Sequence, residues 1–216
     1  MKDLELLREE VFLSNLLLNE YKLVTLTYGN VSGRDSKTGY IFIKPSGVDY
    51  NKLRPKDLVL VDIEGNIIDG ELRPSVDLPI HLYLYKNLPE VNGVVHTHSN
   101  YATAFATIGK SIPVCLTSIA DHFGDIIPCS RYASHEYYDT GEAIIEARTK
   151  SPVVLVKNHG VFTFDKSPSK ALNDAVIVED IAKTYHIALQ VGVPENLTKE
   201  EIKKRWSRYQ TTYGQY

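Results

Sequence analysis

A short β-branched run that ends in two histidines constrains this chain more than any other feature. The run, Val94–Ser99, reads VVHTHS and follows Asn92-Gly93, a dipeptide typical of turns. Side chains alternate between the faces of a strand, so His96 and His98 point the same way, roughly 6–7 Å apart along it. Two such imidazoles can share one metal ion and leave room for a third ligand. Two unrelated histidines, hydrogen-bonded near a strand end, are the alternative.

The candidate third ligand follows a second buried strand. Val153–Val156 is an uninterrupted apolar and mostly β-branched run, which is typical of a strand covered on both faces. It leads directly into Lys157-Asn158-His159-Gly160, and we predict that His159 completes the metal site. Three neutral imidazoles accept zinc, but also cobalt, nickel or manganese, so the sequence does not fix the ion.

Two glycine-containing loops suit a phosphate group. Gly29–Arg34 follows a β-prone run at Leu23–Thr27, and Lys44–Gly47 follows a second one at Tyr40–Ile43. Glycine permits close backbone approach, and exposed N–H groups with Asn, Ser and Lys side chains can hold an anion. Either loop alone could be an ordinary hairpin turn. Two loops of the same make-up, each expected to end a strand, favour the phosphate site.

A helix start adds two further polar candidates. Ser75 precedes a proline-containing first turn, and apolar residues at helical spacing follow from Leu78. Ser75 or Asp77 could therefore cap the helix. Ser75 could instead serve a phosphate, because helix N-termini attract anions.

The bulk composition argues against several classes of protein. The length of 216 residues suits one domain over residues 1–216, and a net charge of -3 gives no sign of nucleic-acid binding. The longest apolar runs fall far short of the roughly 20 residues that a membrane span needs. Residues 1–10 lack the apolar core of a signal peptide, and the two cysteines stand outside any Cys-x-x-Cys pattern. We therefore expect free thiols and a cytoplasmic protein.

Periodicity predicts alternating helices and strands. Helices are expected over residues 4–18, from 78 onward, and over 101–108, 142–148, 170–191 and 199–208. Residues 58–62 and 67–68 are expected to form a hairpin, 120–125 a loop, and the residues up to Pro128 a strand. The mixture of hairpins and helical crossovers predicts a mixed or antiparallel sheet covered by helices.

These motifs, in this order, resemble the class II aldolase/epimerase superfamily over nearly the whole chain. The resemblance rests on Gly29–Ser32, Lys44–Tyr50, Arg73–Ser75, Asp77, Val94–Ser99, Ala120-Asp121, Ile127–Cys129, His159-Gly160 and Tyr213–Gln215. It is closest to bacterial L-ribulose-5-phosphate 4-epimerases, with L-fuculose-1-phosphate aldolases next. It implies a single-domain α/β fold in three αβα layers, with a central, mainly antiparallel sheet. It also implies a homotetramer with active sites at subunit interfaces.

The resemblance assigns roles position by position. The zinc ligands, with Mn2+ or Co2+ as alternative ions, fall on His96, His98 and His159. The acidic residue beside the metal, either a ligand or a proton-transfer group, falls on Asp77. The phosphate-binding residues fall on Asn30, Lys44, Ser46, Gly47 and Ser75. A proton-transfer pair from the neighbouring subunit falls on Asp121 and Tyr213, with Arg205 as a cation that could help Tyr213 act as a base.

Two departures from the epimerase pattern affect the expected substrate. Val76 stands where a second serine is usual, which removes a hydroxyl from the phosphate pocket. Ile119 and His122 stand where a histidine and then a tyrosine are usual. Of the remaining histidines, His81 is expected to be structural, and His135 and His186 to lie on the surface or on a helix face.

The implied reaction converts L-ribulose 5-phosphate to D-xylulose 5-phosphate. Carbon 4 of a 2-ketopentose is not adjacent to the carbonyl and carries no acidic proton, so simple deprotonation is a poor route. A retro-aldol cleavage between carbons 3 and 4 avoids this problem, because the aldehyde can rotate before the bond re-forms. The metal would act as a Lewis acid, and inversion requires a proton-transfer group on each face.

Three other functions are compatible with the same residues. One is an aldolase of the same superfamily, which would release both products. Another is a decarboxylase of a phosphorylated keto-acid, for which Val76 and His122 would suit a different substrate. The last is a non-catalytic scaffold, which the intact histidine ligands argue against.

Overall fold

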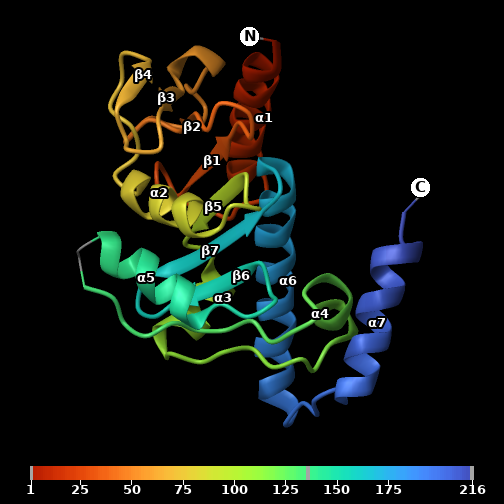
Figure 1. The fold of residues 1–216 in the computed structure, drawn as a ribbon. Helices are drawn as coiled ribbons and strands as arrows, with labels where there is room; N and C mark the ends of the chain where they lie inside the picture. Colours follow the sequence, from red (N-terminus) through yellow and green to blue (C-terminus); the bar gives the residue numbers. More distant parts are fainter. Residues whose placement is uncertain (1, 135–136, 215–216) are drawn as a thin grey trace.

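Short strands form an antiparallel sheet at the centre of the molecule in the computed structural model, which describes residues 2–134 and 137–214 (Figure 1). His135 and Gln215 therefore lie outside the described residues. The strands are β1 (Asn30–Arg34), β2 (Ile41–Ile43), β3 (Val59–Val61), β4 (Ile67–Asp69), β5 (Gly93–Thr97), β6 (Val153–Val156) and β7 (Gly160–Asp165). Within the described residues they form one sheet in the order β4-β3-β2-β1-β5-β7-β6, and each neighbouring pair is antiparallel.

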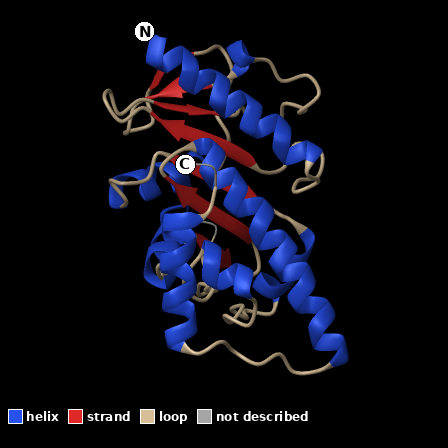
Figure 2. Cartoon of the chain, turned by 90° about the vertical axis from the view of Figure 1, so that its right-hand side faces the viewer, coloured by secondary structure: helices blue, strands red, loops and turns tan. Residues whose placement is uncertain are grey.

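Strand alternation divides the sheet into two apolar faces, each covered by helices. One face packs against α2 (Leu78–Asn87) and α5 (Tyr137–Ala147), and its strand residues are Ile41, Ile43, Val59, Val61, Val94, Val154, Val156, Phe162 and Phe164. The opposite face packs against α1 (Lys2–Glu20), α3 (Asn100–Thr107) and α6 (Pro168–Val191), through residues such as Val31, Val95, Leu155 and Val161. Figure 2 looks onto the side of the molecule that carries α1 and α6. The predicted α/β fold, with helices on both faces of an antiparallel sheet, is confirmed.

Two further helices lie beyond this sandwich. α4 (Thr117–His122) packs against α7 (Lys199–Thr212), which runs back alongside α6 (Figure 1). The Thr198 side chain caps α7 by accepting a hydrogen bond from the backbone N–H of Glu201 at 3.2 Å. Even the longest described helix, α6 with 24 residues, lacks an apolar stretch that would cross a membrane.

The strand predicted at Leu23–Thr27 is wrong. Leu26 has a left-handed backbone (φ 55°), as does Lys22 just before the run (φ 58°), and a strand cannot continue through such positions. Leu23 is nevertheless buried, against α1 and α6, so its apolar character reflects a packed connection. The first strand begins only at Asn30, which means that the first glycine loop opens a strand and does not end one.

Three smaller predictions also need correction. The first half of the loop expected at 120–125 is helical, because α4 extends to His122. The strand expected up to Pro128 is reduced to single bridges, Ile112 with Ile127 and Cys129 with Leu155. The last helix runs to Thr212, four residues beyond the predicted end. The strand β7 was not predicted at all. The remaining helices and strands lie within a few residues of their predicted bounds, apart from α5, which begins at Tyr137.

Gly93, the first residue of β5, lies against the start of α6. A Cβ atom at this position would lie 2.2 Å from the carbonyl carbon and oxygen of Ser167 and 2.4 Å from the nitrogen of Pro168. These are backbone atoms, so they cannot rotate away as a side chain could. Glycine at this position therefore lets the central strand meet the N-terminus of α6.

We expect Gly93→Ala to lower the free energy of unfolding by about 3 kcal/mol, the upper end of the usual range for overpacking. Denaturant unfolding followed by circular dichroism measures this loss. Gly192→Ala is the matched control, because its Cβ would meet no atom within 4 Å and its φ of 173° is ordinary extended backbone. Equal stability of the two variants would contradict the close contact between β5 and α6.

Candidate metal centre and substrate pockets

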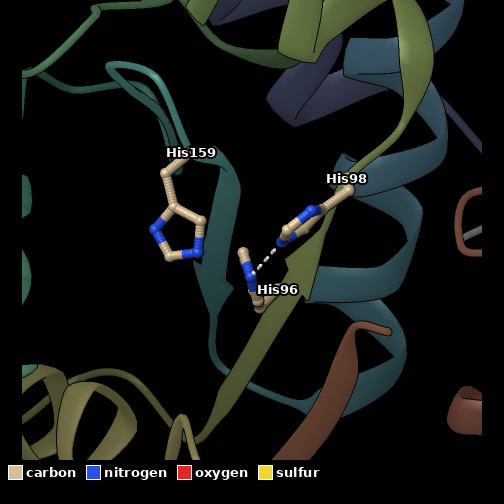
Figure 3. Close-up of side chains that lie close together, drawn as sticks. All are labelled: His96, His98 and His159. Carbon is tan, nitrogen blue, oxygen red and sulfur yellow. Dashed lines mark hydrogen bonds between the residues drawn. The ribbon is translucent and has the colours of Figure 1, made fainter. Parts of the chain in front are cut away.

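The three predicted histidines meet at one end of the sheet (Figure 3). His96 lies in β5, His98 follows directly after that strand, and His159 lies in the turn between β6 and β7. The Nε2 atoms of His96 and His98 are 2.9 Å apart. One ring nitrogen from each of the three residues lies within 4.8 Å of the other two. The structure thus brings together all three residues that the sequence suggested.

Neighbouring groups fix the orientation of the His96 ring. Its Nδ1 atom lies 3.0 Å from the carbonyl oxygen of Val161, to which it donates, and its ring stacks on Phe162 with centroids 4.2 Å apart. A proton held on Nδ1 leaves the lone pair on Nε2, the atom that faces His98 and that could bind a metal ion. Gly160 makes room for this arrangement, because a Cβ there would lie 2.5 Å from the Thr97 carbonyl oxygen and 3.1 Å from the His98 ring.

Burial sets the charges that a metal site needs. It lowers the pKa of His96 to about 3 and also lowers the pKa of His98, so both rings are neutral at pH 7. Burial alone would raise the pKa of the Asp77 carboxyl, but His96, His81 and a hydrogen bond from Asn30 hold it below its ordinary value. The site therefore offers neutral imidazoles beside an ionised carboxylate.

This donor set fits a divalent metal ion. Three histidines with an open fourth position are the ligands of many catalytic zinc sites. A tetrahedral ion with bonds of about 2.0–2.1 Å separates its ligand atoms by roughly 3.3 Å, so the two Nε2 atoms need to part by only a few tenths of an ångström. The same nitrogen donors also accept other divalent ions, so the identity of the metal stays a prediction.

A cavity of about 300 Å³ lies beside the three histidines. Its lining includes the five residues that were predicted to bind phosphate, Asn30, Lys44, Ser46, Gly47 and Ser75. They come from the start of β1, the loop after β2 and the segment before α2, and the cavity also includes Asp77. Three segments that are distant in sequence thus converge on one pocket next to the histidines.

Asn30 ties the pocket together. Its Nδ2 atom donates to the Asp77 carboxylate at 2.7 Å and to the Ser75 hydroxyl at 2.9 Å, and its Oδ1 atom is buried without a partner among the described residues. The Ser75 hydroxyl also accepts from the backbone N–H of Asp77 at 3.2 Å. Asp77 occupies the N-cap position of α2, but its side chain makes no capping hydrogen bond there. Its carboxylate is directed instead to the network beside the histidines.

Lys44 contributes a weakly held cation to the same cavity. Its side chain is buried, and its Nζ atom lies 4.7 Å from the centre of the Tyr50 ring. The ammonium donates two long hydrogen bonds of 3.4 Å, to the carbonyl oxygens of Thr27 and Pro45. Burial lowers the pKa of this ammonium to about 8. A bound anion would therefore stabilise its charged form.

His81 has a structural position, as predicted. It is fully buried, its Nδ1 atom lies 2.7 Å from the Ser32 hydroxyl, and that hydroxyl lies 2.8 Å from the Tyr85 hydroxyl. These contacts join α2 to the strand β1, on the face of the sheet that α2 covers.

Asp121 and Tyr213 lie together, but in a different cavity. This second cavity, of about 450 Å³, lies between α4 and α7 and includes Arg205 in its lining. Arg205 approaches the two Asp121 carboxylate oxygens at 3.4 and 3.3 Å. The two cavities share no lining residue. One chain therefore does not bring the acid and the tyrosine to the histidines.

A third cavity, which the sequence did not indicate, adjoins the histidines. It has a volume of about 390 Å³ and shares Asp77 and His159 with the metal side, while its outer wall includes Tyr132 and Ser134. Those two residues belong to a connection without regular secondary structure, so no periodicity marks them.

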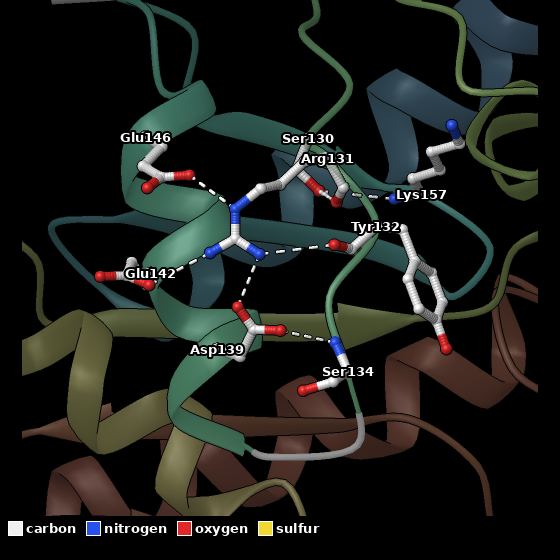
Figure 4. A network of polar contacts seen from close by, with 8 residues as sticks. All are labelled: Ser130, Arg131, Tyr132, Ser134, Asp139, Glu142, Glu146 and Lys157. Atoms are coloured by element: carbon white, nitrogen blue, oxygen red, sulfur yellow. Dashed lines mark hydrogen bonds and ion pairs between the residues drawn. The ribbon is translucent and has the colours of Figure 1, made fainter.

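Arg131 fastens this connection to α5 (Figure 4). Its guanidinium forms ion pairs with Asp139 at 2.6 Å, Glu142 at 3.1 Å and Glu146 at 2.8 Å. The acids recur at spacings of three and four residues, which places them on one helix face. This acidic stripe is the sequence signal that could have identified the contact.

Comparison with known proteins places the chain in a family. The chain is 28% identical to an L-fuculose 1-phosphate aldolase of known structure, with a TM-score of 0.85, and the match covers 94% of this chain and 96% of that one. It is 25% identical to Escherichia coli YgbL, described as a candidate aldolase/epimerase/decarboxylase, with a TM-score of 0.81 and coverage of 93% and 98%. An L-fuculose-1-phosphate aldolase from Thermus thermophilus is also 25% identical, with a TM-score of 0.68 and coverage of 84% and 96%.

None of these three structures is described as an L-ribulose-5-phosphate 4-epimerase, so the nearer likeness to that enzyme stays a prediction. Residues 9–186 match the class II aldolase and adducin N-terminal domain. This match covers most of the sequence, includes the three histidines and agrees with the observed fold, so the chain belongs to the class II aldolase and adducin N-terminal domain family.

Proposed function

We propose that this protein is a metal-dependent enzyme that converts L-ribulose 5-phosphate to D-xylulose 5-phosphate by retro-aldol and aldol chemistry. The observation that carries the proposal is the pairing of Asp121 with Tyr213 in one cavity, next to Arg205. Inversion at carbon 4 needs two proton-transfer groups, one for each face of the aldehyde. The family, the three histidines and the adjoining cation-containing cavity support a sugar-phosphate substrate.

The chain's own residues divide the work between them. His96, His98 and His159 would hold the ion, which when bound supplies a Lewis acid for the substrate ketone. Lys44, with Asn30, Ser46, Gly47 and Ser75, would hold the phosphate while the aldehyde turns. Asp77 stays ionised beside the histidines and would either bind the ion or accept a proton.

Asp121 and Tyr213 would move the protons. Both line the cavity between α4 and α7, and Tyr213 is 72% exposed in a single chain. Arg205, within ion-pair distance of Asp121, brings a positive charge into the same cavity.

The separation of the two cavities supports a shared active site. We propose a homotetramer in which the α4–α7 cavity of one subunit faces the histidines of its neighbour. Such an arrangement would cover Tyr213 and exclude water from the substrate. We also propose a cytoplasmic location.

A class II sugar-phosphate aldolase is the second candidate. The 28% identity to an L-fuculose 1-phosphate aldolase over 94% of the chain favours it. The similarity to YgbL keeps a decarboxylase of a phosphorylated keto-acid among the alternatives. Aspartate at position 77 and the Asp121–Tyr213 pair are the features that favour the epimerase.

The direct test incubates zinc-loaded protein with L-ribulose 5-phosphate and follows D-xylulose 5-phosphate by NMR. We expect turnover in the wild type, none in His98→Ala together with loss of stoichiometric zinc, and a rate lowered roughly 100-fold or more in Tyr213→Phe with zinc retained. Accumulation of free glycolaldehyde phosphate would instead establish the aldolase. No turnover at full metal occupancy would exclude the epimerase.

Lys44 should give the enzyme a characteristic pH dependence. Its ammonium is charged below a pKa of about 8, so binding of the phosphate should weaken as the pH rises above that value. We expect kcat/KM to fall in this range, and Lys44→Met to raise KM at pH 7 about 10- to 100-fold and to remove the fall. Lys52→Met, at an exposed lysine outside the cavity, is the control and should behave as the wild type. An unchanged KM in the Lys44 variant would remove it from the phosphate site.

Mixed tetramers test the shared active site. His98→Ala and Tyr213→Phe each damage a different half, so co-expression should restore activity to about a quarter of the wild-type value if subunits assemble at random. The readout is the specific activity of the mixture against that of each variant alone. A mixture no more active than the better single variant would show that both halves come from one chain.

A further inference from the structure

Three aromatic rings lie in contact in the cavity between α4 and α7, and two of them are stacked. The Tyr213 ring stacks on the Tyr209 ring, with centroids 4.3 Å apart and planes inclined by 22°. Tyr209 also contacts His122, with centroids 4.5 Å apart and planes inclined by 59°. All three residues line the cavity that contains Asp121. Among the described residues, Tyr209 is the ring that contacts Tyr213.

The helix period accounts for this stack. Arg205, Tyr209 and Tyr213 follow one another at intervals of four residues, so they lie along one face of α7 and its C-terminal end. Asp121 and His122 are the last two residues of α4, opposite this face. Arg205 pairs with Asp121 and Tyr209 with His122, which gives two cross-helix contacts in succession.

The packing of α4 against α7 holds the stack in place. A Cβ at Gly124, just after α4, would lie 2.8 Å from the Trp206 ring, so the backbone and the indole are in close contact. Trp206 adjoins Arg205 in sequence. Tyr209 is therefore attached to a fixed part of the fold, whereas Tyr213 stands at the C-cap of α7 and is largely exposed.

The charge state of Tyr209 suits a supporting role. Burial, followed by the proximity of Tyr213 and Asp121, raises the pKa of the Tyr209 phenol. Its ring therefore stays neutral at the pH values at which an enzyme would work. A neutral ring can stack on Tyr213 without competing for its proton.

We propose that Tyr209, supported by His122, is a positioning residue that holds the Tyr213 ring in the orientation needed for proton transfer. This inference rests on the proposed function, in which Tyr213 transfers a proton. It also gives a physical role to His122, one of the positions at which the sequence departs from the epimerase pattern. Its imidazole contacts the Tyr209 ring from α4, with the two planes inclined by 59°.

Substitutions at Tyr209 separate positioning from chemistry. We expect Tyr209→Leu to lower kcat about 10- to 100-fold, because a small misplacement of a catalytic group costs this much, while KM stays within about twofold. Tyr209→Phe keeps the stacked ring and should stay within about threefold of the wild-type kcat. Tyr138→Leu is the control, since Tyr138 is an exposed ring on α5 that contacts Tyr83 and lies outside the cavity. It should leave both constants unchanged.

A double variant gives the sharper kinetic test. If Tyr209 acts through Tyr213, then Tyr209→Leu with Tyr213→Phe should be no slower than Tyr213→Phe alone. Losses that multiply would show that Tyr209 acts independently, and would overturn the proposal. Thermal unfolding and gel filtration of each variant confirm that the fold and assembly are retained.

A second readout does not need activity. In protein labelled with 3-fluorotyrosine, the Tyr213 resonance is identified by its absence from the spectrum of Tyr213→Phe. We expect this resonance to narrow and to move toward the free amino acid in Tyr209→Leu, but to stay unchanged in Tyr138→Leu. An unchanged resonance in Tyr209→Leu would overturn the positioning role. A shifted resonance in a protein that turns over no sugar phosphate would leave the positioning intact and reject the proposed function instead.

Discussion

The pairing of β5 with its two neighbours is the constraint on which the site depends. Across three adjacent strands, Asn30 of β1, His96 of β5 and Phe162 of β7 lie in one row. The backbone ladder thus places a pocket residue, a predicted metal ligand and the ring that supports that ligand side by side. A slip of one residue in either pairing would turn the imidazole to the opposite face, where α6 packs. The contacts that maintain this register, including that of Gly93 with Ser167, therefore also maintain the site.

Desolvation prepares the same region for its ligands before any ligand arrives. It keeps the His96 ring unprotonated, while the surrounding imidazoles and Asn30 keep Asp77 ionised against the effect of burial. At Lys44, burial lowers the pKa of the ammonium. The ammonium makes only long hydrogen bonds among the described residues. The pocket thus combines electron-pair donors at one end with an incompletely solvated cation at the other. A molecule with a chelating head and an anionic tail complements both.

Sequence patterns identified those parts of the fold that repeat a simple period. Val153–Val156 was predictable because both of its faces are buried, and His96 and His98 were predictable because strand alternation places them on one side. The same propensities failed at Leu23–Thr27, since burial there comes from a turn that packs against helices.

The site was predictable where its residues lie at or just beyond the end of a strand. The three histidines lie in such positions, and the structure brings them together. Tyr132 does not, because its position is set by tertiary contacts of an irregular connection. The relation of Tyr213 to Tyr209 depended on the true length of α7, which Gly214, directly after the C-cap residue Tyr213, could have indicated.

Arg131 attaches one wall of the histidine region by ion pairs, unlike the rest of that region. The strand-borne ligands are held by hydrogen-bonded ladders and buried apolar side chains, which dissolved salt affects little. The connection that carries Tyr132 is attached to α5 through a half-exposed guanidinium and three carboxylates. Mobile ions screen such charges over about 8 Å at physiological ionic strength, and over shorter distances in concentrated salt. Dissolved salt therefore weakens the attachment of this wall of the third cavity more than it weakens the ladders that hold the histidines.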